Sequence, residues 1–200
     1  TLPFLGFLIA AMRLKRENPR RSKLNKIGLS LSTSYLILTL IFKWISFKEF
    51  KKGLQNQNIE YVEMDTKPAP LNSILWSSLI ETDNGYRTAY YSLFDQHEIS
   101  YSKEFAKNHQ LIDPYLNQEV VQQLIDISAG WYRIEERNGK LLFWDLRFGQ
   151  MGMDVNKASF LWYYELNIDE TGNVTAIKRQ PPIKNFKMVF QELTHRIKGN

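Results

Sequence analysis

The feature that most constrains this chain is an uncharged apolar stretch near its start. Residues 27–42 read Ile-Gly-Leu-Ser-Leu-Ser-Thr-Ser-Tyr-Leu-Ile-Leu-Thr-Leu-Ile-Phe. Residues 43–47 extend the stretch to about 20 residues, which is the length of a helix that spans a bilayer. Lys43 and Trp44 stand near one end, where a lysine head group and an indole ring both favour the membrane interface. The alternative is a buried core helix, since the stretch contains several hydroxylated residues. We predict a transmembrane helix over residues 27–47.

A second apolar segment opens the chain at residues 1–12. As a helix it would reach only about 18 Å, which is too short to cross a bilayer. We therefore expect the end of a transmembrane helix whose beginning precedes Thr1. Residues 13–26, between the two apolar segments, carry seven Lys or Arg against one Glu, and we predict that they form a basic loop. Together these segments predict a membrane anchor region over residues 1–49.

The bias of Lys and Arg toward the cytoplasm places this loop inside and residues 50–200 outside. The four lysines in residues 43–52 oppose that orientation, but the loop before the helix has seven basic residues. The orientation rule still favours an extracytoplasmic domain.

The net charge of +5 comes from residues 1–52, which carry a charge of +9. Residues 53–200 hold 15 basic and 19 acidic side chains, a charge of −4. A domain that binds nucleic acid needs clustered positive charge on its own surface, so we expect no nucleic-acid partner. The chain has no cysteine, which excludes disulfides, thiolate metal ligands and cysteine nucleophiles. Its three histidines lie far apart in sequence, and we expect neither a metal site nor another cofactor in this chain.

Residues 50–200 show short β-rich runs separated by turn residues. Asn-Gly between apolar runs is a strong hairpin signal, and it occurs at Asn84-Gly85 and Asn138-Gly139. The three predicted hairpins pair Leu71–Glu81 with Tyr86–Phe94, Trp131–Arg137 with Lys140–Phe148, and Phe160–Ile168 with Val174–Arg179. An edge strand is predicted at Ile59–Met64. Successive antiparallel hairpins predict an α+β domain with a mostly antiparallel sheet.

Two helices are expected to pack on this sheet. One runs from Asn117, as its N-terminal cap, to Ser128, and Gly130 ends it. The other opens at Pro181-Pro182 and closes at Lys198-Gly199. Several strands are apolar on both faces, so both faces of the sheet should be covered, by the helices or by the surface next to the membrane.

The candidate ligand-binding residues are Asp145, Arg147 and Tyr132. Alternation along the strand places Asp145 and Arg147 on one face, and a two-residue turn at Asn138-Gly139 places Tyr132 opposite Asp145. A charged pair on a largely apolar face can recognise a polar ligand. The alternative is a structural ion pair at the margin of the sheet. The chain contains no catalytic motif of the Gly-x-Ser-x-Gly, His-Glu-x-x-His or phosphate-loop type, so we predict no catalytic residues.

The chain resembles a known family in several stretches. They are Thr1-Leu-Pro-Phe-Leu5, the basic loop, Leu31-Ser-Thr-Ser-Tyr-Leu36, Asn72-Ser-Ile-Leu-Trp76, Gly85-Tyr-x-x-x-Tyr-Tyr-Ser-Leu-Phe94 and Asp145-Leu-Arg-Phe-Gly149. The family is that of the membrane-bound metal-dependent hydrolases, also described as LexA-binding inner-membrane-associated hydrolases. The resemblance covers nearly all of this chain but only the C-terminal half of such a protein.

The resemblance implies a bacterial inner-membrane protein whose divalent-metal motifs lie in the earlier, membrane-embedded half. None of those motifs has a counterpart here, so no metal ligand is carried over. The first hypothesis is therefore an extracytoplasmic accessory domain of such a hydrolase, with the lipid bilayer and the missing N-terminal half as partners. The alternatives are a ligand- or partner-binding envelope module and a purely structural domain.

Overall fold

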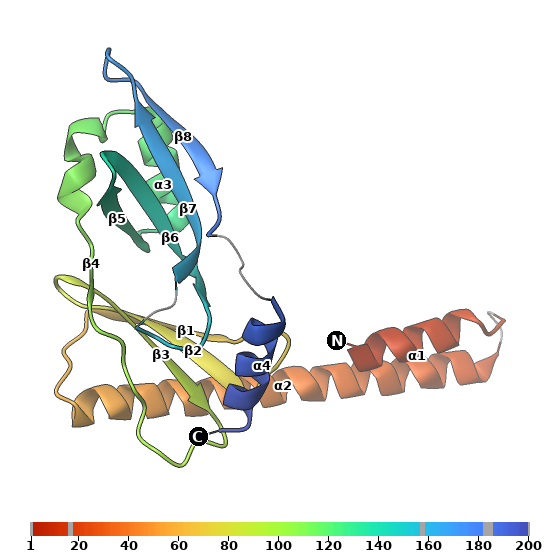
Figure 1. The fold of residues 1–200 in the computed structure, drawn as a ribbon. Coiled ribbons are helices and arrows are strands. Elements are labelled where there is room, and N and C mark those ends of the chain that lie inside the picture. Colours follow the sequence, from red (N-terminus) through yellow and green to blue (C-terminus); the bar gives the residue numbers. More distant parts are fainter. Residues whose placement is uncertain (1, 16–17, 157–158, 182–185, 200) are drawn as a thin grey trace. The chain divides into compact units, whose positions relative to one another are not determined.

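The computed structural model describes residues 2–15, 18–156, 159–181 and 186–199. The α+β class predicted from the sequence is confirmed: helices accompany two four-stranded antiparallel sheets (Figure 1). The chain divides into two compact units, Thr1–Ile45 and Ser46–Asn200. The first unit is helical, and the second contains both sheets.

The first unit contains α1 (Leu2–Met12) and most of α2 (Pro19–Asn56). The prediction of a basic loop over residues 13–26 is wrong from Pro19 onward, because that part is helical. The Asn18 side chain accepts a hydrogen bond from the Arg20 N–H at 2.9 Å, which is the contact of a helix N-cap. Proline suits the position after such a cap, and Lys and Arg are good helix formers. The Asn-Pro pair therefore starts the helix earlier than the apolar stretch does.

Within this unit a small residue lets α1 and α2 approach closely. A Cβ atom on Gly28 would lie only 2.8 Å from the Cβ of Phe7, so no larger residue fits there without a shift. Ala11 is buried in the same unit. Small residues at such contacts are common where helices pack in a membrane.

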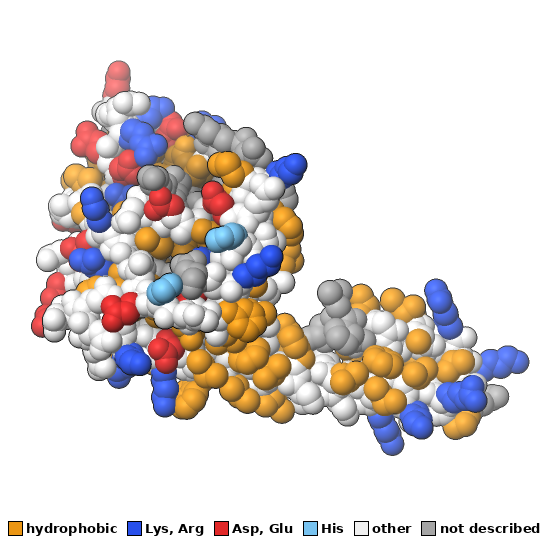
Figure 2. All heavy atoms as spheres, turned by 60° about the horizontal axis from the view of Figure 1, so that its bottom comes forward, with side chains coloured by type: hydrophobic (Ala, Val, Ile, Leu, Met, Phe, Trp, Pro, Cys, Tyr) orange, Lys and Arg blue, Asp and Glu red, His pale blue; other side chains and the backbone are white. Residues whose placement is uncertain are grey.

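Among the described residues, α2 is the one helix long and apolar enough to cross a membrane, by length and composition. Large apolar side chains along it are exposed, for example Leu36, Ile37 and Leu40. Figure 2 shows hydrophobic side chains along these helices and Lys and Arg side chains gathered at one end of them. Exposed apolar side chains of this kind suit a lipid environment better than water.

Sheet A of the second unit has the order β1-β2-β3-β4. Its strands are β1 (Glu63–Pro68), β2 (Leu75–Glu81), β3 (Gly85–Ser92) and β4 (Phe105–Ala106). The edge strand predicted at Ile59–Met64 is displaced to β1, because the Ile59 N–H instead bonds to the Leu54 carbonyl at the end of α2. The short strand β4 was not predicted.

The predicted start of the first hairpin at Leu71 is also wrong. Asn72 accepts hydrogen bonds from the N–H groups of Ile74 and Leu75, at 2.9 and 2.7 Å, and so holds a turn in place of a strand. Strand β2 therefore begins at Leu75, and Leu71 has a positive φ of 62°.

Sheet B has the order β5-β6-β7-β8. Its strands are β5 (Tyr132–Arg137), β6 (Lys140–Met151), β7 (Ser159–Ile168) and β8 (Val174–Arg179). Asn138 and Gly139 have φ values of 54° and 72°, as a two-residue turn of type I′ requires. The register between β5 and β6 follows from this turn.

The expectation of a single sheet is wrong, because the strands divide between two sheets. A core cluster explains how strands with two apolar faces are covered: Tyr86 of sheet A packs with Leu142, Trp144, Leu146 and Phe160 of sheet B. One sheet therefore covers part of the other.

Helices cover the remaining apolar faces. The 3-10 helix η1 (His109–Tyr115) and α3 (Glu119–Ser128) contribute Ile112, Val121 and Leu124 to a core with Phe143 of sheet B. The predicted cap at Asn117 is wrong: Gln118 is the N-cap residue and makes no side-chain cap hydrogen bond.

Helix α4 (Phe186–Ile197) contributes Leu193 to a further core cluster with Leu75 and Tyr90 of sheet A. The start predicted for this helix at Pro181-Pro182 involves Pro182, which lies outside the described residues.

The end of α2 belongs to the core of the second unit. Phe50 and Leu54 are fully buried, and the Tyr101 hydroxyl donates a hydrogen bond to the Phe50 carbonyl at 2.6 Å. Gly53 makes room for this contact, since a Cβ there would lie 2.6 Å from the Tyr101 hydroxyl oxygen.

Candidate functional site

The predicted ion pair between Asp145 and Arg147 is present in sheet B. The Arg147 Nε and Nη2 atoms donate to the two carboxylate oxygens of Asp145 at 3.0 and 2.7 Å. The Arg147 backbone N–H adds a third hydrogen bond at 3.1 Å. Asp145 is 2% exposed, and its hydrogen bond to the guanidinium raises the pKa of Arg147. Each charge therefore has its partner inside the protein.

This pair stabilises an irregularity in β6. Pairing of β6 with β7 is regular up to Asp145 and resumes at Gln150 after a register shift, which marks a β-bulge. Gly149 lies in the bulge with a φ of 75°, a value that favours glycine. Because three hydrogen bonds tie Arg147 to Asp145, the pair holds the local bend of the strand.

Tyr132 lies opposite Asp145, as the turn predicted, but its ring belongs to the core. It is 7% exposed and stacks on His109 at 4.0 Å and on Phe143 at 4.6 Å between ring centroids. Burial raises the pKa of the Tyr132 hydroxyl. The structure thus joins Asp145 to Arg147 and places the Tyr132 ring among core side chains.

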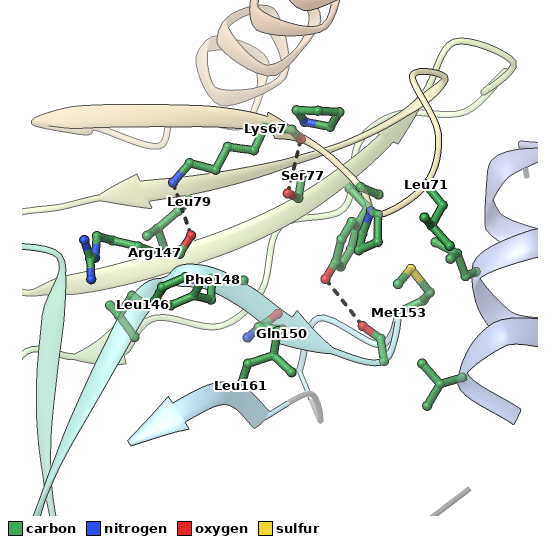
Figure 3. Close-up of a pocket in the computed structure, with 18 of the residues that line it drawn as sticks. Lys67, Leu71, Ser77, Leu79, Leu146, Arg147, Phe148, Gln150, Met153 and Leu161 are labelled. Carbon is green, nitrogen blue, oxygen red and sulfur yellow. Dashed lines mark hydrogen bonds between the residues drawn. The ribbon is translucent and has the colours of Figure 1, made fainter. Parts of the chain in front are cut away.

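A mainly apolar cavity in the second unit lies between the two sheets and α4 (Figure 3). Its volume is about 360 Å³, within the range of about 300–1,000 Å³ typical of small-molecule sites. The wall comes from β1, β2 and β3, from residues 146–150 of the bulged strand β6, from β7 and from α4. The bulge is what brings this part of β6 to the cavity, since residues 146–149 have no partner in β7.

Most of the wall is apolar. Leu79 of β2, Leu146 of β6 and Leu161 of β7 contribute aliphatic side chains, and Met153 adds a flexible thioether (Figure 3). Helix α4 supplies Val189, Phe190 and Leu193. Such a lining suits an apolar ligand, because burying apolar surface is favourable by about 25 cal/mol per Å².

Several polar groups of the wall are bonded to one another. Lys67 of β1 donates to the Arg147 carbonyl at 3.2 Å and pairs with Asp65 at 2.5 Å (Figure 3). The Ser77 hydroxyl donates to the Lys67 carbonyl at 3.3 Å. Lys67 thereby ties sheet A to the bulge of sheet B.

The hydroxyl of Tyr90, from β3, donates to the Gly152 carbonyl at 3.4 Å. This bond is a second tie between the two sheets. Burial raises the pKa of Tyr90 to about 12, so the phenol stays neutral at physiological pH.

Exposed apolar residues also line this cavity. Leu71 is 95% exposed, Phe148 55% and Phe190 48%. They come from the segment before β2, from the bulge and from α4, which are far apart in sequence. Exposed apolar side chains gathered at a cavity mark it as a place where an apolar molecule enters or docks.

Sequence reasoning missed this cavity, because its wall is assembled from segments more than 100 residues apart. One signal was available: Gly149 follows the Asp145-Arg147 pair, and an isolated glycine inside a strand pattern indicates a bulge.

Asp95, His97 and Glu98 stand close together in the sequence, where a metal site could assemble. No group of three or more His, Asp or Glu side chains suited to a metal ion occurs among the described residues. Asp95 instead pairs with Arg196 of α4 through two contacts of 2.6 Å.

Comparisons with protein-family models, with curated proteins and with solved structures found no match for this chain. The geometry of the cavity is therefore the basis for a functional proposal.

Proposed function

We propose that this protein is a membrane-anchored binding module that holds a small apolar ligand in the cavity between its two sheets. The observation that carries the proposal is the apolar cavity of about 360 Å³, bordered by exposed Leu71, Phe148 and Phe190. A ligand bound in an apolar cavity of this size buries apolar surface, which is favourable by about 25 cal/mol per Å².

The membrane part of the proposal rests on α2. In this proposal α2 crosses the bacterial inner membrane, and the second unit lies outside the cytoplasm. The exposed apolar side chains of α2 and the basic residues at residues 13–26 support it.

The relation to the membrane-bound metal-dependent hydrolases remains part of the proposal. In a hydrolase of that kind this module would present or retain a substrate or lipid beside a metal site held by the N-terminal half. Metal content and esterase or phosphatase activity, measured on this chain and on a longer form with that half, test the relation. Metal and activity confined to the longer form support it, and stoichiometric metal in this chain contradicts it.

The absence of cysteine allows a direct test of the cavity. Leu161→Cys places the chain's only thiol on the cavity wall, and Ile177→Cys places it on β8, away from the cavity. Both variants, in vesicles, are treated with a small water-soluble thiol reagent, with and without a neutral long-chain alcohol.

We expect the alcohol to slow the labelling of Leu161→Cys at least several-fold and to leave Ile177→Cys unchanged. Equal effects on the two variants would mean that the alcohol acts on the membrane and not in the cavity. No effect on Leu161→Cys at saturating alcohol would refute the binding function.

A further inference from the structure

We propose that the occupant of the cavity is an acyl chain of a bilayer lipid, whose head group stays outside the cavity; this inference rests on the proposed function. Four observations lead to it: the apolar wall, the internal pairing of the polar groups, the exposed apolar residues and the presence of α2 in the same chain.

The first step concerns charge. Lys67 is paired with Asp65 and with the Arg147 carbonyl, and Arg147 is paired with Asp145. Because the carboxylates of Asp65 and Asp145 already neutralise these two cations, a charged ligand would find no net countercharge in the wall, and burying an uncompensated charge is costly. The cavity therefore favours the uncharged part of an amphiphile.

The second step concerns hydrogen bonding. The Gln150 Oε1 atom accepts a hydrogen bond from the Thr88 hydroxyl at 3.0 Å. Its Nε2 atom has no hydrogen-bond partner among the described residues, but it is fully buried, so a ligand would reach it only after a shift of the side chain. The Tyr90 hydroxyl is engaged with Gly152. The wall thus offers a ligand little polar recognition, which suits a hydrocarbon chain.

The third step concerns shape. The wall runs from Leu79 and Leu146 at one end to Met153 and α4 at the other, between the two sheets (Figure 3). A flexible single chain can follow such a wall, and Met153 can adapt to it.

The fourth step concerns the source of the acyl chain. Leu71, Phe148 and Phe190 are exposed beside the cavity, where they would stay in contact with the part of the chain that emerges. A protein held at a bilayer by α2 meets lipid at a far higher effective concentration than any dissolved apolar compound. The bilayer lipid is therefore favoured over a free fatty acid.

The test uses the full chain in phosphatidylcholine vesicles that contain one of two photoreactive lipids. One lipid carries a diazirine at the end of an acyl chain, and the other carries it on the head group. After irradiation, labelled peptides are identified by mass spectrometry. Labelling of α2 by the chain-end lipid serves as an internal standard.

We expect the chain-end lipid to label the peptides that contain Met153 and Leu161, and the head-group lipid not to label them. Leu161→Trp, which fills the cavity, should lower this labelling at least fivefold while the labelling of α2 persists. The matched variant Ile177→Trp, on β8, should be labelled by the chain-end lipid to the same extent as the wild type. Labelling confined to α2 in the wild type would overturn the inference.

A third arm separates the two sources of an acyl chain. A photoreactive free fatty acid is added from water, with and without Lys67→Met. If it labels the cavity more strongly than the lipid and loses that labelling in Lys67→Met, the occupant is a free carboxylate and the lipid inference is wrong. If the alcohol slows the thiol labelling of Leu161→Cys but neither photoreactive lipid labels the cavity peptides, the binding function stands and only this inference fails.

Discussion

The contact between Arg196 and Asp95 attaches α4 to the turn that follows β3, and its loss should be measurable. The guanidinium Nη1 and Nη2 atoms each lie 2.6 Å from one carboxylate oxygen of Asp95, and Nη2 also donates to the Tyr90 carbonyl at 3.0 Å. The side chains of Arg196 and Asp95 are only 14% and 5% exposed. A paired-fork contact of this kind is among the stronger side-chain interactions.

Arg196→Ala should reduce the free energy of unfolding by about 3 kcal/mol. Removing one partner of a buried ion pair costs about 3–5 kcal/mol, mainly because the other charge stays buried without compensation. The lower end applies because Asp95 still accepts a hydrogen bond from the Ser92 N–H at 2.9 Å. Arg179→Ala is the control: the Arg179–Glu165 contact is 3.7 Å, the Arg179 side chain is 49% exposed, and a loss below about 1 kcal/mol is expected.

The assay is urea unfolding of the full chain in mild detergent, followed by the fluorescence of buried tryptophans such as Trp76 and Trp144. With a slope of about 2 kcal/mol per M, Arg196→Ala should lower the midpoint by about 1.5 M. The double variant Asp95→Asn with Arg196→Ala should recover part of the loss, since it removes the unpaired charge. An Arg196→Ala midpoint within the range of the Arg179→Ala control would refute the reasoning.

Two further predictions concern the wall of the cavity. Asp145→Ala should cost about 2 kcal/mol in the same urea assay, because the bulge loses its hydrogen bonds to the Asp145 carboxylate while the partly exposed Arg147 side chain stays solvated, and a loss below about 0.5 kcal/mol would contradict the structural role of the pair. Stability should also fall as pH rises from about 10 to about 12. Burial raises the pKa of Tyr90 from 10.0 to about 12, so its neutral form stabilises the fold below pH 10 and the contribution, about 2–3 kcal/mol, is lost as pH rises through 12. Tyr90→Phe should lose less stability than the wild type over that interval, and an identical loss would exclude Tyr90 as a cause.

Part of the candidate site could be predicted because it depends on neighbours in sequence. Asp145 and Arg147 are two residues apart, so strand alternation places them on one face, and the Asn138-Gly139 turn sets Tyr132 opposite Asp145. Their roles could not be predicted. Whether Arg147 faces a ligand or closes a bulge depends on the pairing with β7, and the Tyr132 ring is held by His109 from a separate helix.

The errors in the fold have a common cause. The start of α2 at Pro19 followed from the capping contact of Asn18, which competes with the apolar pattern as a helix signal. The start of β2 was decided by the Asn72 side chain, whose hydrogen bonds favour a turn over a strand. Local side-chain hydrogen bonds thus set the boundaries that hydrophobic periodicity alone leaves imprecise.

The sequence by itself determined the features that act over a few residues. These are the uncharged apolar stretch within α2, the turn at Asn138-Gly139 and the α+β class. Only the tertiary structure decided that the strands divide into two sheets, that one sheet covers the other and that α4 completes a cavity with Lys67 and the bulge of β6. The reason is physical: a turn or a helix is stabilised by contacts within a few residues, whereas the pairing of distant apolar surfaces depends on burial summed over the whole chain.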